Sequence, residues 1–250
     1  MNPFLKKVCE NVCSPVVTNN ATPSISDIGG NLLARFSAAE SDFSLVGNEI
    51  ALWVDIGSRS YDAVGHATDG TKRPLYLETG WDGVRPCVSF DGINDYLVFP
   101  AIPNTNGTEV FIVAKTSNLV GNRAYLGASA AGGPNIVIDS AGKIRLNRQS
   151  QAVLCITPSA ITTSPYVINA KAKYPTNFVG LYLNGITQQT AAVAASFTSG
   201  YTTIGAISAG GTFSFFLEGS IAEILIYDGN LTDTQRKQIE RFLRVQWGIL

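Results

Sequence analysis

Short strand-like runs separated by turns recur from Asn31 onward and constrain the fold more than any other feature of the chain. In the clearest case, Asn184 and Gly185 join the runs Phe178 to Leu183 and Ile186 to Gln189. An Asn-Gly pair supplies the two positive φ angles of a type I′ turn, which is a common tight connection between antiparallel strands. The sequence therefore predicts a β-hairpin over these residues.

Two further strand predictions lie in the first half of the chain. Arg85 to Phe90 alternates in part, and Tyr96 to Phe99 follows the turn residues Asn94 and Asp95, so these runs are expected to form a second hairpin. Val110 to Ala114 is apolar at every position, which is typical of a central strand covered on both faces. The chain is therefore expected to be mainly β.

The hydrophobic periodicity becomes helical only near the C-terminus. Thr232 is a good helix N-cap, Gln235 stands at the capping-box position, and Asp233 favours the positive end of the helix dipole. Four apolar residues then share one helical face: Ile239, Phe242, Leu243 and Trp247. Gly248 provides a C-cap. One helix over roughly 232–246, after many strands, predicts an all-β domain with a terminal helix packed on its side.

Two stretches carry motifs of a known type. Phe90 to Leu97 reads Phe-Asp-Gly-Ile-Asn-Asp-Tyr-Leu, and Gly219 to Tyr227 reads as a Gly-x-Ile-Ala-Glu-Ile-x-Ile-Tyr strand before the capped helix and Trp247-Gly248. Further matches are Leu33-Ala34-Arg35-Phe36, Trp53-Val54-Asp55-Ile56-Gly57, Arg73-Pro74 and Leu181-Tyr182-Leu183-Asn184-Gly185. With these motifs, residues 31–250 resemble the laminin-G-like, concanavalin A-like lectin/glucanase superfamily, in the variant common in bacterial and bacteriophage surface proteins. The resemblance implies a two-sheet antiparallel jelly-roll sandwich with one C-terminal α-helix.

The composition excludes few classes of protein. Charged residues make up 15% of the chain and the formal net charge is −1, which gives no electrostatic reason to expect a nucleic acid or an anionic membrane as a partner. No run approaches the roughly 20 apolar residues of a membrane span, and residues 1–17 lack the apolar core of a signal peptide. The protein is therefore expected to be made in a cytoplasm without export.

Residues 1–30 differ in composition from the predicted sandwich. Four apolar residues would line one face of a short helix: Phe4, Leu5, Val8 and Val12. The segment is either an arm that docks onto another subunit or a terminus that wraps around its own domain. Cys9 and Cys13 leave open a bridge or half of a metal site, whereas Cys87 and Cys155 are expected to be small buried hydrophobes.

The acidic residues do not form a glucanase motif. A retaining glycosidase needs two carboxylates about 5–5.5 Å apart, which on a strand means even spacing. Glu218 and Glu223 are five apart and face opposite sides of a strand unless Gly219 marks a bulge. The resemblance implies instead that Glu223 has a buried hydrogen-bonding role. His66, the single histidine, stands in a loop without a nucleophile motif. The chain is therefore expected not to be an enzyme.

Calcium is the one cofactor for which candidate ligands exist. Asp91, Asn94 and Asp95 offer the oxygen atoms that calcium prefers. The same residue types also stabilise turns through hydrogen bonds to nearby backbone groups. Both interpretations of this segment stay open.

Sugar sites combine an aromatic face with amides and carboxylates around it. The candidate contacts, whose aromatic members are expected to be exposed, are Trp81, Asp82, Tyr125, Tyr174 and Tyr201. Trp81, which Asp82-Gly83 follows, is the best of them, although a tryptophan that pins a long loop is an equal alternative. Trp53 and Trp247 match core positions of the superfamily and are expected to be buried.

Three functional hypotheses follow. The first is a non-enzymatic surface protein of a bacteriophage virion, either a capsid decoration protein or a tail-associated adhesin, with a lectin-like domain for a host or environmental glycan. Its partners would be other virion subunits, reached through the N-terminal arm, and further copies of itself. The second is a polysaccharide-active enzyme or its carbohydrate-binding module. The third is a structural cement protein without a ligand.

Overall fold

The computed structural model describes residues 25–103, 107–130, 132–148, 153–173, 178–192, 197, 199–229 and 231–249. Its helices are α1 (Ile25–Ile28), the 3₁₀-helix η2 (Gly70–Lys72) and α2 (Asp233–Gln246). Its strands are β1 (Leu32–Ser37), β2 (Phe43–Val46), β3 (Glu49–Trp53), β4 (Ala63–Val64), β5 (Leu75–Leu77), β6 (Cys87–Asp91), β7 (Leu97–Val98), β8 (Gly107–Thr116), β9 (Arg123–Gly127), β10 (Pro134–Ile138), β11 (Ile144–Arg148), β12 (Val153–Ile156), β13 (Tyr166–Lys173), β14 (Phe178–Leu183), β15 (Ile186–Ala192), β16 (Thr203–Ile204), β17 (Ile207–Ala209), β18 (Thr212–Ser214) and β19 (Glu218–Tyr227).

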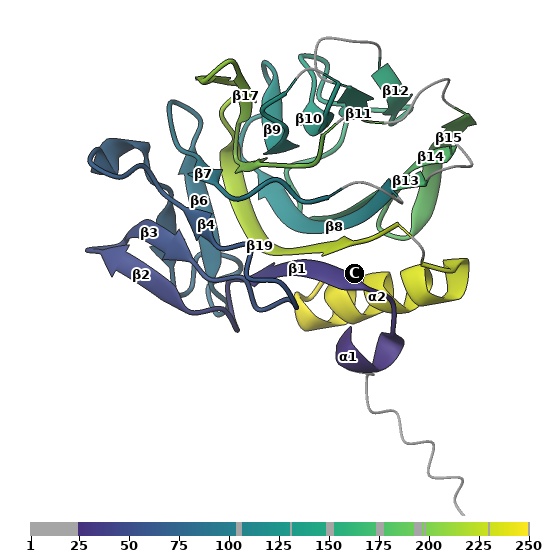
Figure 1. Ribbon diagram of the computed structural model, residues 1–250, viewed down its shortest axis with the longest axis horizontal. Helices are drawn as coiled ribbons and strands as arrows, with labels where there is room; N and C mark the ends of the chain where they lie inside the picture. Colours follow the sequence, from purple (N-terminus) through teal and green to yellow (C-terminus); the bar gives the residue numbers. More distant parts are fainter. Residues whose placement is uncertain are drawn as a thin grey trace, which may run out of the picture.

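Most of these strands form two layers of antiparallel sheet (Figure 1). In one layer β15, β14, β13, β8 and β19 pair in that order, and β19 pairs with β1 along one part and with β6 along another. In the other layer β4, β7, β16, β9, β10, β11 and β12 pair in that order. β3 pairs with both β4 and β5 and so links the layers. The predicted two-sheet sandwich with one C-terminal helix is confirmed.

The central strand β8 shows why the sandwich has two cores. Val110 and Ile112 face the core between the two layers, whereas Phe111 and Val113 face a second core beneath α2. All four side chains are fully buried. The prediction that this apolar run is covered on both faces is confirmed, because a sheet lies on one side and a helix on the other (Figure 1).

The helix α2 begins and packs as its sequence predicts. Thr232 and Gln235 form the expected capping box. The predicted face points into the second core, where Ile239, Leu243 and Trp247 are buried and Phe242 packs against them. The short helix α1 adds to this core and receives a hydrogen bond from Gln235 Nε2 to the carbonyl of Ile28, at 3.2 Å. No helix in the described part of the chain is long and apolar enough to cross a membrane.

The two predicted hairpins have different outcomes. Asn184 and Gly185 have φ angles of 50° and 81° and join β14 to β15, so the first hairpin is confirmed. The second is wrong, since β6 pairs with β5 and β19 whereas β7 pairs with β4 and β16. The turn between β6 and β7 therefore carries the chain from one layer to the other.

The N-terminal arm is described only at its end. Ile25 and Ile28, which the sequence assigns to the arm, pack into the second core. The earlier positions singled out in the arm, Phe4, Leu5, Val8, Cys9, Val12 and Cys13, lie outside the described residues. Cys87 and Cys155 are buried, as predicted, and neither forms a disulfide in the described part of the chain.

Candidate functional site

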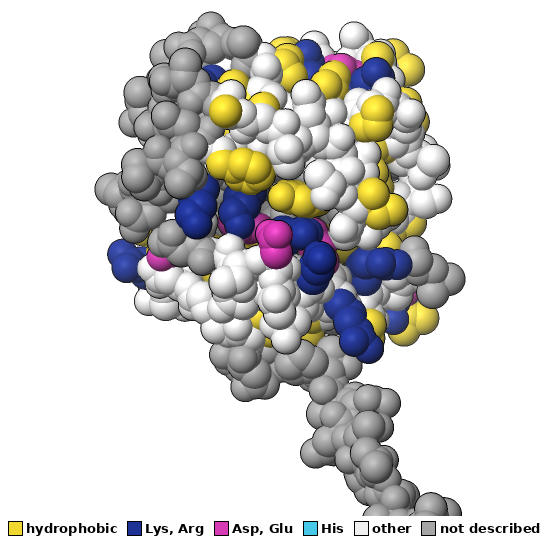
Figure 2. Space-filling view, turned by 90° about the vertical axis from the view of Figure 1, so that its right-hand side faces the viewer, with side chains coloured by type: hydrophobic (Ala, Val, Ile, Leu, Met, Phe, Trp, Pro, Cys, Tyr) yellow, Lys and Arg dark blue, Asp and Glu magenta, His cyan; other side chains and the backbone are white. Residues whose placement is uncertain are grey.

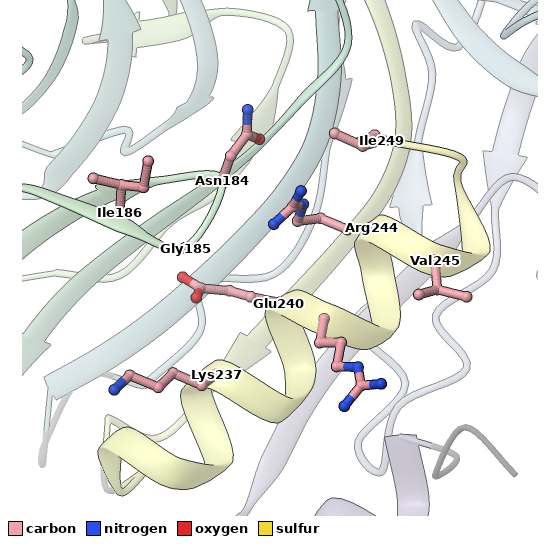
Figure 3. Close-up of a pocket in the computed structure, with 9 residues that line it drawn as sticks. Asn184, Gly185, Ile186, Lys237, Glu240, Arg244, Val245 and Ile249 are labelled. Atoms are coloured by element: carbon pink, nitrogen blue, oxygen red, sulfur yellow. The ribbon is translucent and has the colours of Figure 1, made fainter. Parts of the chain in front are cut away.

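A hollow of about 600 Å³ lies between α2 and the turn that joins β14 to β15 (Figure 3). We call it the helix pocket. Its lining residues are Asn184, Gly185, Ile186, Lys237, Glu240, Arg241, Arg244, Val245 and Ile249. It therefore has one wall from a hairpin and one from a helix.

The hairpin wall is fixed by the turn itself. The Asn184 side chain accepts a hydrogen bond from the Val167 N–H at 2.8 Å, and the Asn184 N–H donates to the Val167 carbonyl at 2.9 Å. Gly185 lies so close to α2 that a Cβ atom there would stand 3.3 Å from Glu240 Oε2. Its positive φ also disfavours any side chain. The turn is thus held over the Glu240 carboxylate.

Three cations line the helix wall. Lys237, Arg241 and Arg244 are spaced by four and three residues, which places them on one flank of α2. Lys237 and Arg241 are exposed, and Arg244 is half-buried with an Nε atom that has no hydrogen-bond partner among the described residues. Figure 2 looks from the side where β14, β15 and the start of α2 lie, and it shows Lys and Arg side chains gathered in a band with fewer acidic ones. This flank is therefore electropositive.

Glu240 is the one carboxylate among the described residues that line the helix pocket. Its side chain points toward the turn at Gly185 (Figure 3) and accepts hydrogen bonds from Arg236 Nη1 at 3.2 and 3.0 Å. The Arg236 guanidinium in turn stacks over the Tyr182 ring, 4.0 Å from its centre. Burial raises the pKa of Glu240 to about 6, although Arg236 opposes the shift. Glu240 thus has Arg236 as its hydrogen-bond partner and also interacts electrostatically with Arg244, so its one negative charge stands beside three pocket cations.

Apolar side chains complete the helix pocket. Ile186 and Val245 are 67% and 58% exposed, and Ile249 is buried. Such a lining can hold a molecule that has an anionic group and an apolar face, since the cations bind the charge and the aliphatic groups exclude water from it.

A buried ion pair lies deeper, between the sheet and α2. Lys171 Nζ stands 2.9 Å from Glu109 Oε2 and donates to the Leu231 carbonyl at 2.9 Å. Asn169 Nδ2 donates to Glu109 Oε1 at 3.3 Å. Both charged side chains are nearly inaccessible to solvent. This pair is buried and therefore closed to a ligand.

The predicted sugar contacts that the structure describes do not line the helix pocket, and Trp81 lies in a different core from Tyr125 and Tyr201. Trp81 is only 3% exposed, and its Nε1 donates to the Trp247 carbonyl at 3.0 Å. Lys115 Nζ lies 5.4 Å from the centre of the Trp81 ring. Asp82 is a turn residue that accepts hydrogen bonds from backbone N–H groups and pairs with Arg85. The expectation that Trp81 is exposed is wrong, because the end of α2 covers it.

The predicted tyrosines are buried where they are described. Tyr125 is fully buried and shares a hydrogen bond with the Tyr166 hydroxyl, and Tyr201 is 2% exposed. The expectation of exposed rings is therefore wrong for both, because they face the core between the layers. Tyr174 lies outside the described residues.

The candidate calcium ligands act as turn residues. Asp91 Oδ1 accepts from the N–H groups of Ile93 and Asn94, at 2.8 and 3.2 Å, and Asp95 Oδ2 accepts from the Asp91 N–H at 2.9 Å. Burial raises the pKa of Asp95 to about 6. Within the described ranges, no three His, Cys, Asp or Glu side chains converge as a metal site would require. The turn-stabilising alternative accounts for these contacts.

The two glutamates of β19 are each engaged in a different contact. Glu223 is fully buried between Arg35 Nε at 2.8 Å and Trp247 Nε1 at 2.6 Å, which confirms its predicted hydrogen-bonding role. Glu218 receives a hydrogen bond from Arg123 Nη2 at 3.3 Å. The bulge of β19 against β8 lies between Ile221 and Glu223 rather than at Gly219.

The single histidine also has a local role. His66 Nδ1 accepts a hydrogen bond from the Asp69 N–H at 3.1 Å. Its ring meets the edge of Tyr96, with the ring centres 6.3 Å apart. The histidine is thus part of a loop, as the sequence indicates.

The comparisons with known proteins identify a fold. No protein-family model matches the chain, and no curated protein matches it in sequence. Among solved structures, Trypanosoma rangeli sialidase in complex with sialic acid is 16% identical, with 94% of this chain and 36% of the sialidase covered and a TM-score of 0.59. The same sialidase in complex with 2,3-difluorosialic acid is 17% identical, with 94% of this chain and 36% of the sialidase covered and a TM-score of 0.61. A heptameric SAP-like pentraxin from Limulus polyphemus is 17% identical, with 61% of this chain and 80% of the pentraxin covered and a TM-score of 0.50.

These likenesses show a concanavalin-like sandwich, which is the coarse part of the predicted resemblance. The laminin-G and bacteriophage type has no matching family behind it. The expectation that the chain is not an enzyme is contradicted, because the structures that match 94% of it are sialidases, which are glycoside hydrolases. This chain spans about a third of the sialidase chains it matches.

Proposed function

We propose that the chain is a lectin-like, glycan-recognising domain that binds an acidic saccharide in the helix pocket. The observation that carries the proposal is the set of three cations, Lys237, Arg241 and Arg244, around a hollow of about 600 Å³ with an aliphatic wall. A carboxylate on a sugar would accept charge-assisted hydrogen bonds from these groups. The C–H face of the same sugar would pack on Ile186 and Val245, which are exposed.

The fold supports a saccharide as the source of the anionic group. Sialic acid, which is present in the Trypanosoma rangeli sialidase structure, is an acidic sugar. The size of the pocket suits one or two sugar rings, since ligand pockets usually enclose about 300–1,000 Å³. A free phosphate or sulfate ion would use the cations but not the aliphatic wall.

The test is a titration with sialyllactose and with an oligosaccharide of uronic acids, each beside the matching neutral saccharide. The wild-type protein should bind an acidic member and lose affinity when salt rises from about 0.1 M to about 1 M. The double variant Lys237→Ala/Arg241→Ala should bind at least about 10-fold more weakly, because each charge-assisted hydrogen bond contributes about that much. Sugar release is followed in the same samples to register hydrolysis.

A matched control uses another exposed arginine. Arg59→Ala removes a cation from the loop after β3 and should leave the affinity unchanged. The proposal fails if no acidic saccharide binds, or if Lys237→Ala/Arg241→Ala binds as the wild type does. Equal competition by inorganic phosphate would refute the saccharide as the source of the anion.

Attachment to a virion through the N-terminal arm, and assembly with further copies, stay predictions. The arm residues concerned, 1–24, lie outside the described residues. Deletion up to residue 24 keeps α1 and so keeps Ile25 and Ile28 in the second core. We expect the shortened protein to fold and to lose assembly by size-exclusion chromatography. Assembly equal to that of the full chain would refute an anchoring role.

A further inference from the structure

A second hollow, of about 540 Å³, lies between the β2–β3 hairpin and the turn after β5. We call it the hairpin cleft. Its lining residues are Leu45, Asn48, Tyr76, Leu77, Glu78, Thr79 and Gly80. β2 and β3 lie at one end of the molecule in Figure 1, and β14 and β15 at the other, so the hairpin cleft is separate from the helix pocket.

The aromatic ring of the hairpin cleft is held in place from behind. Tyr76 is half-buried and packs against Phe43, with the ring centres 4.6 Å apart. Its backbone N–H donates to the Asn48 carbonyl at 2.8 Å, and its hydroxyl lies 3.4 Å from the Ala38 carbonyl. The ring is thus ordered before any ligand arrives, which lowers the entropy cost of binding.

The polar lining consists of three exposed side chains. Asn48 supplies an amide, Glu78 a carboxylate and Thr79 a hydroxyl, and all three are exposed. In the part of the chain that the structure describes, no hydrogen bond or ion pair holds these three side chains. They are therefore available to a ligand.

The floor of the hairpin cleft is rigid. Lys115 Nζ donates to the Gly80 carbonyl at 2.9 Å and to that of Trp81. Lys115 is directed to these carbonyl oxygens and does not line the cleft, so Glu78 is the single charged residue among the lining residues that the structure describes. A cleft with a carboxylate and without a lining cation disfavours an anion.

The combination of groups defines the ligand class. An aromatic ring packs on the C–H face of a sugar ring, and a carboxylate accepts hydrogen bonds from hydroxyl groups. An amide donates and accepts, which suits neighbouring sugar hydroxyls. We propose that the hairpin cleft is a second saccharide subsite, for an uncharged pyranose, and this inference rests on the proposed glycan recognition. The domain would then hold an acidic and a neutral sugar at separate places.

Saturation-transfer NMR with the methyl pyranosides of glucose, galactose and mannose tests the proposal, followed by titration of any that bind. The wild type should bind at least one. Asn48→Ala/Glu78→Gln, which changes exposed residues, should weaken that binding at least about 10-fold at an unchanged melting temperature. Tyr76→Phe keeps the ring and should retain binding.

The helix-pocket variant Lys237→Ala/Arg241→Ala makes the two sites distinguishable. It should bind the neutral pyranoside as the wild type does, whereas Asn48→Ala/Glu78→Gln should keep the acidic saccharide. If no pyranoside binds, or if Asn48→Ala/Glu78→Gln binds it normally, the hairpin cleft is not a subsite. If the wild type binds a pyranoside but no acidic saccharide, the proposed function of the helix pocket is refuted, whereas the hairpin cleft still holds a neutral sugar.

Discussion

Replacing Trp247 by alanine tests whether the end of α2 holds the second core together. Trp247 is 1% exposed, and its ring meets that of Trp81 edge to face with centres 5.9 Å apart. Its Nε1 donates to the buried carboxylate of Glu223 at 2.6 Å. Removing a buried tryptophan ring costs about 3–5 kcal/mol of unfolding free energy through lost packing and the cavity that remains. The Glu223 carboxylate would also lose a donor.

The hydrogen-bond part can be measured separately with Trp247→Phe. This variant keeps an aromatic ring and removes the N–H, and a hydrogen bond to a charged group contributes about 1.5–3 kcal/mol. The unfolding free energy of the alanine variant should therefore fall by about 5 kcal/mol or more. Because that loss approaches the total stability of many domains, the alanine variant can be unfolded, and the milder phenylalanine variant keeps the prediction measurable.

The assay is urea denaturation followed by circular dichroism, with the dependence on urea compared between variants. Val245→Ala is the matched control, because Val245 is on the same helix and 58% exposed, and it should change the unfolding free energy by less than about 0.5 kcal/mol. A loss below about 2 kcal/mol for Trp247→Ala, or none for Trp247→Phe, would refute the reasoning.

Three further predictions concern stability. Burial raises the pKa of Asp95 and of Glu240 to about 6, so each contributes stability that is full below its unfolded pKa and is lost as the pH rises through about 6. Each should add about 1 kcal/mol of unfolding free energy at about pH 5 relative to about pH 7.5, and Asp95→Asn should remove its share in urea titrations at the two pH values. Gly219→Ala should cost about 1–3 kcal/mol in the same assay, because its Cβ would lie 2.4 Å from the Lys115 carbonyl oxygen, and an unchanged unfolding free energy would contradict this. Thr232→Ala should lower the unfolding free energy by about 1 kcal/mol through loss of the helix cap, and an unchanged melting curve would contradict this.

The sequence predicts the elements whose signals are local. The capping box at Thr232 and Gln235 and the turn at Asn184 and Gly185 depend on residues within a few positions of each other, and the structure has both. For the same reason the sequence wrongly predicts a hairpin at the turn between β6 and β7. Asp95 closes this turn by accepting a hydrogen bond from the backbone N–H of Asp91. The same hydrogen bond can form in a hairpin turn and in a turn that crosses between layers.

The aromatic residues show where local signals end. Trp81 lies in a turn beside Asp82 and Gly83, which is typical of an exposed loop. Its burial depends on Trp247, which is 166 positions away in sequence and receives the Trp81 hydrogen bond on its carbonyl oxygen. Tyr125 depends in the same way on Tyr166 from another strand. A single sequence contains no signal for these pairs.

The cations of the helix pocket could have been recognised in part. Lys237, Arg241 and Arg244 have the spacing of one helical flank, which is readable once α2 is predicted. The sequence cannot show that the turn at Gly185 lies opposite them. Only the pairing of β13 with β14, and the packing of α2 on that layer, bring the turn and the helix together.

The position of Glu240 on α2 explains why this residue both packs against the sheet and lines the helix pocket. At about 100° of rotation per residue, Arg236 and Glu240 lie at the edge of the buried face of α2, and Arg244, Lys237 and Arg241 follow around the same flank. Glu240 is therefore buried against the sheet and still borders the helix pocket. Burial accounts for its raised pKa, Arg236 donates its hydrogen bonds, and Arg244 also interacts with its charge. A ligand anion would thus bind beside a carboxylate that is already paired with Arg236. The helix pocket can therefore be electropositive although Glu240 is part of its lining.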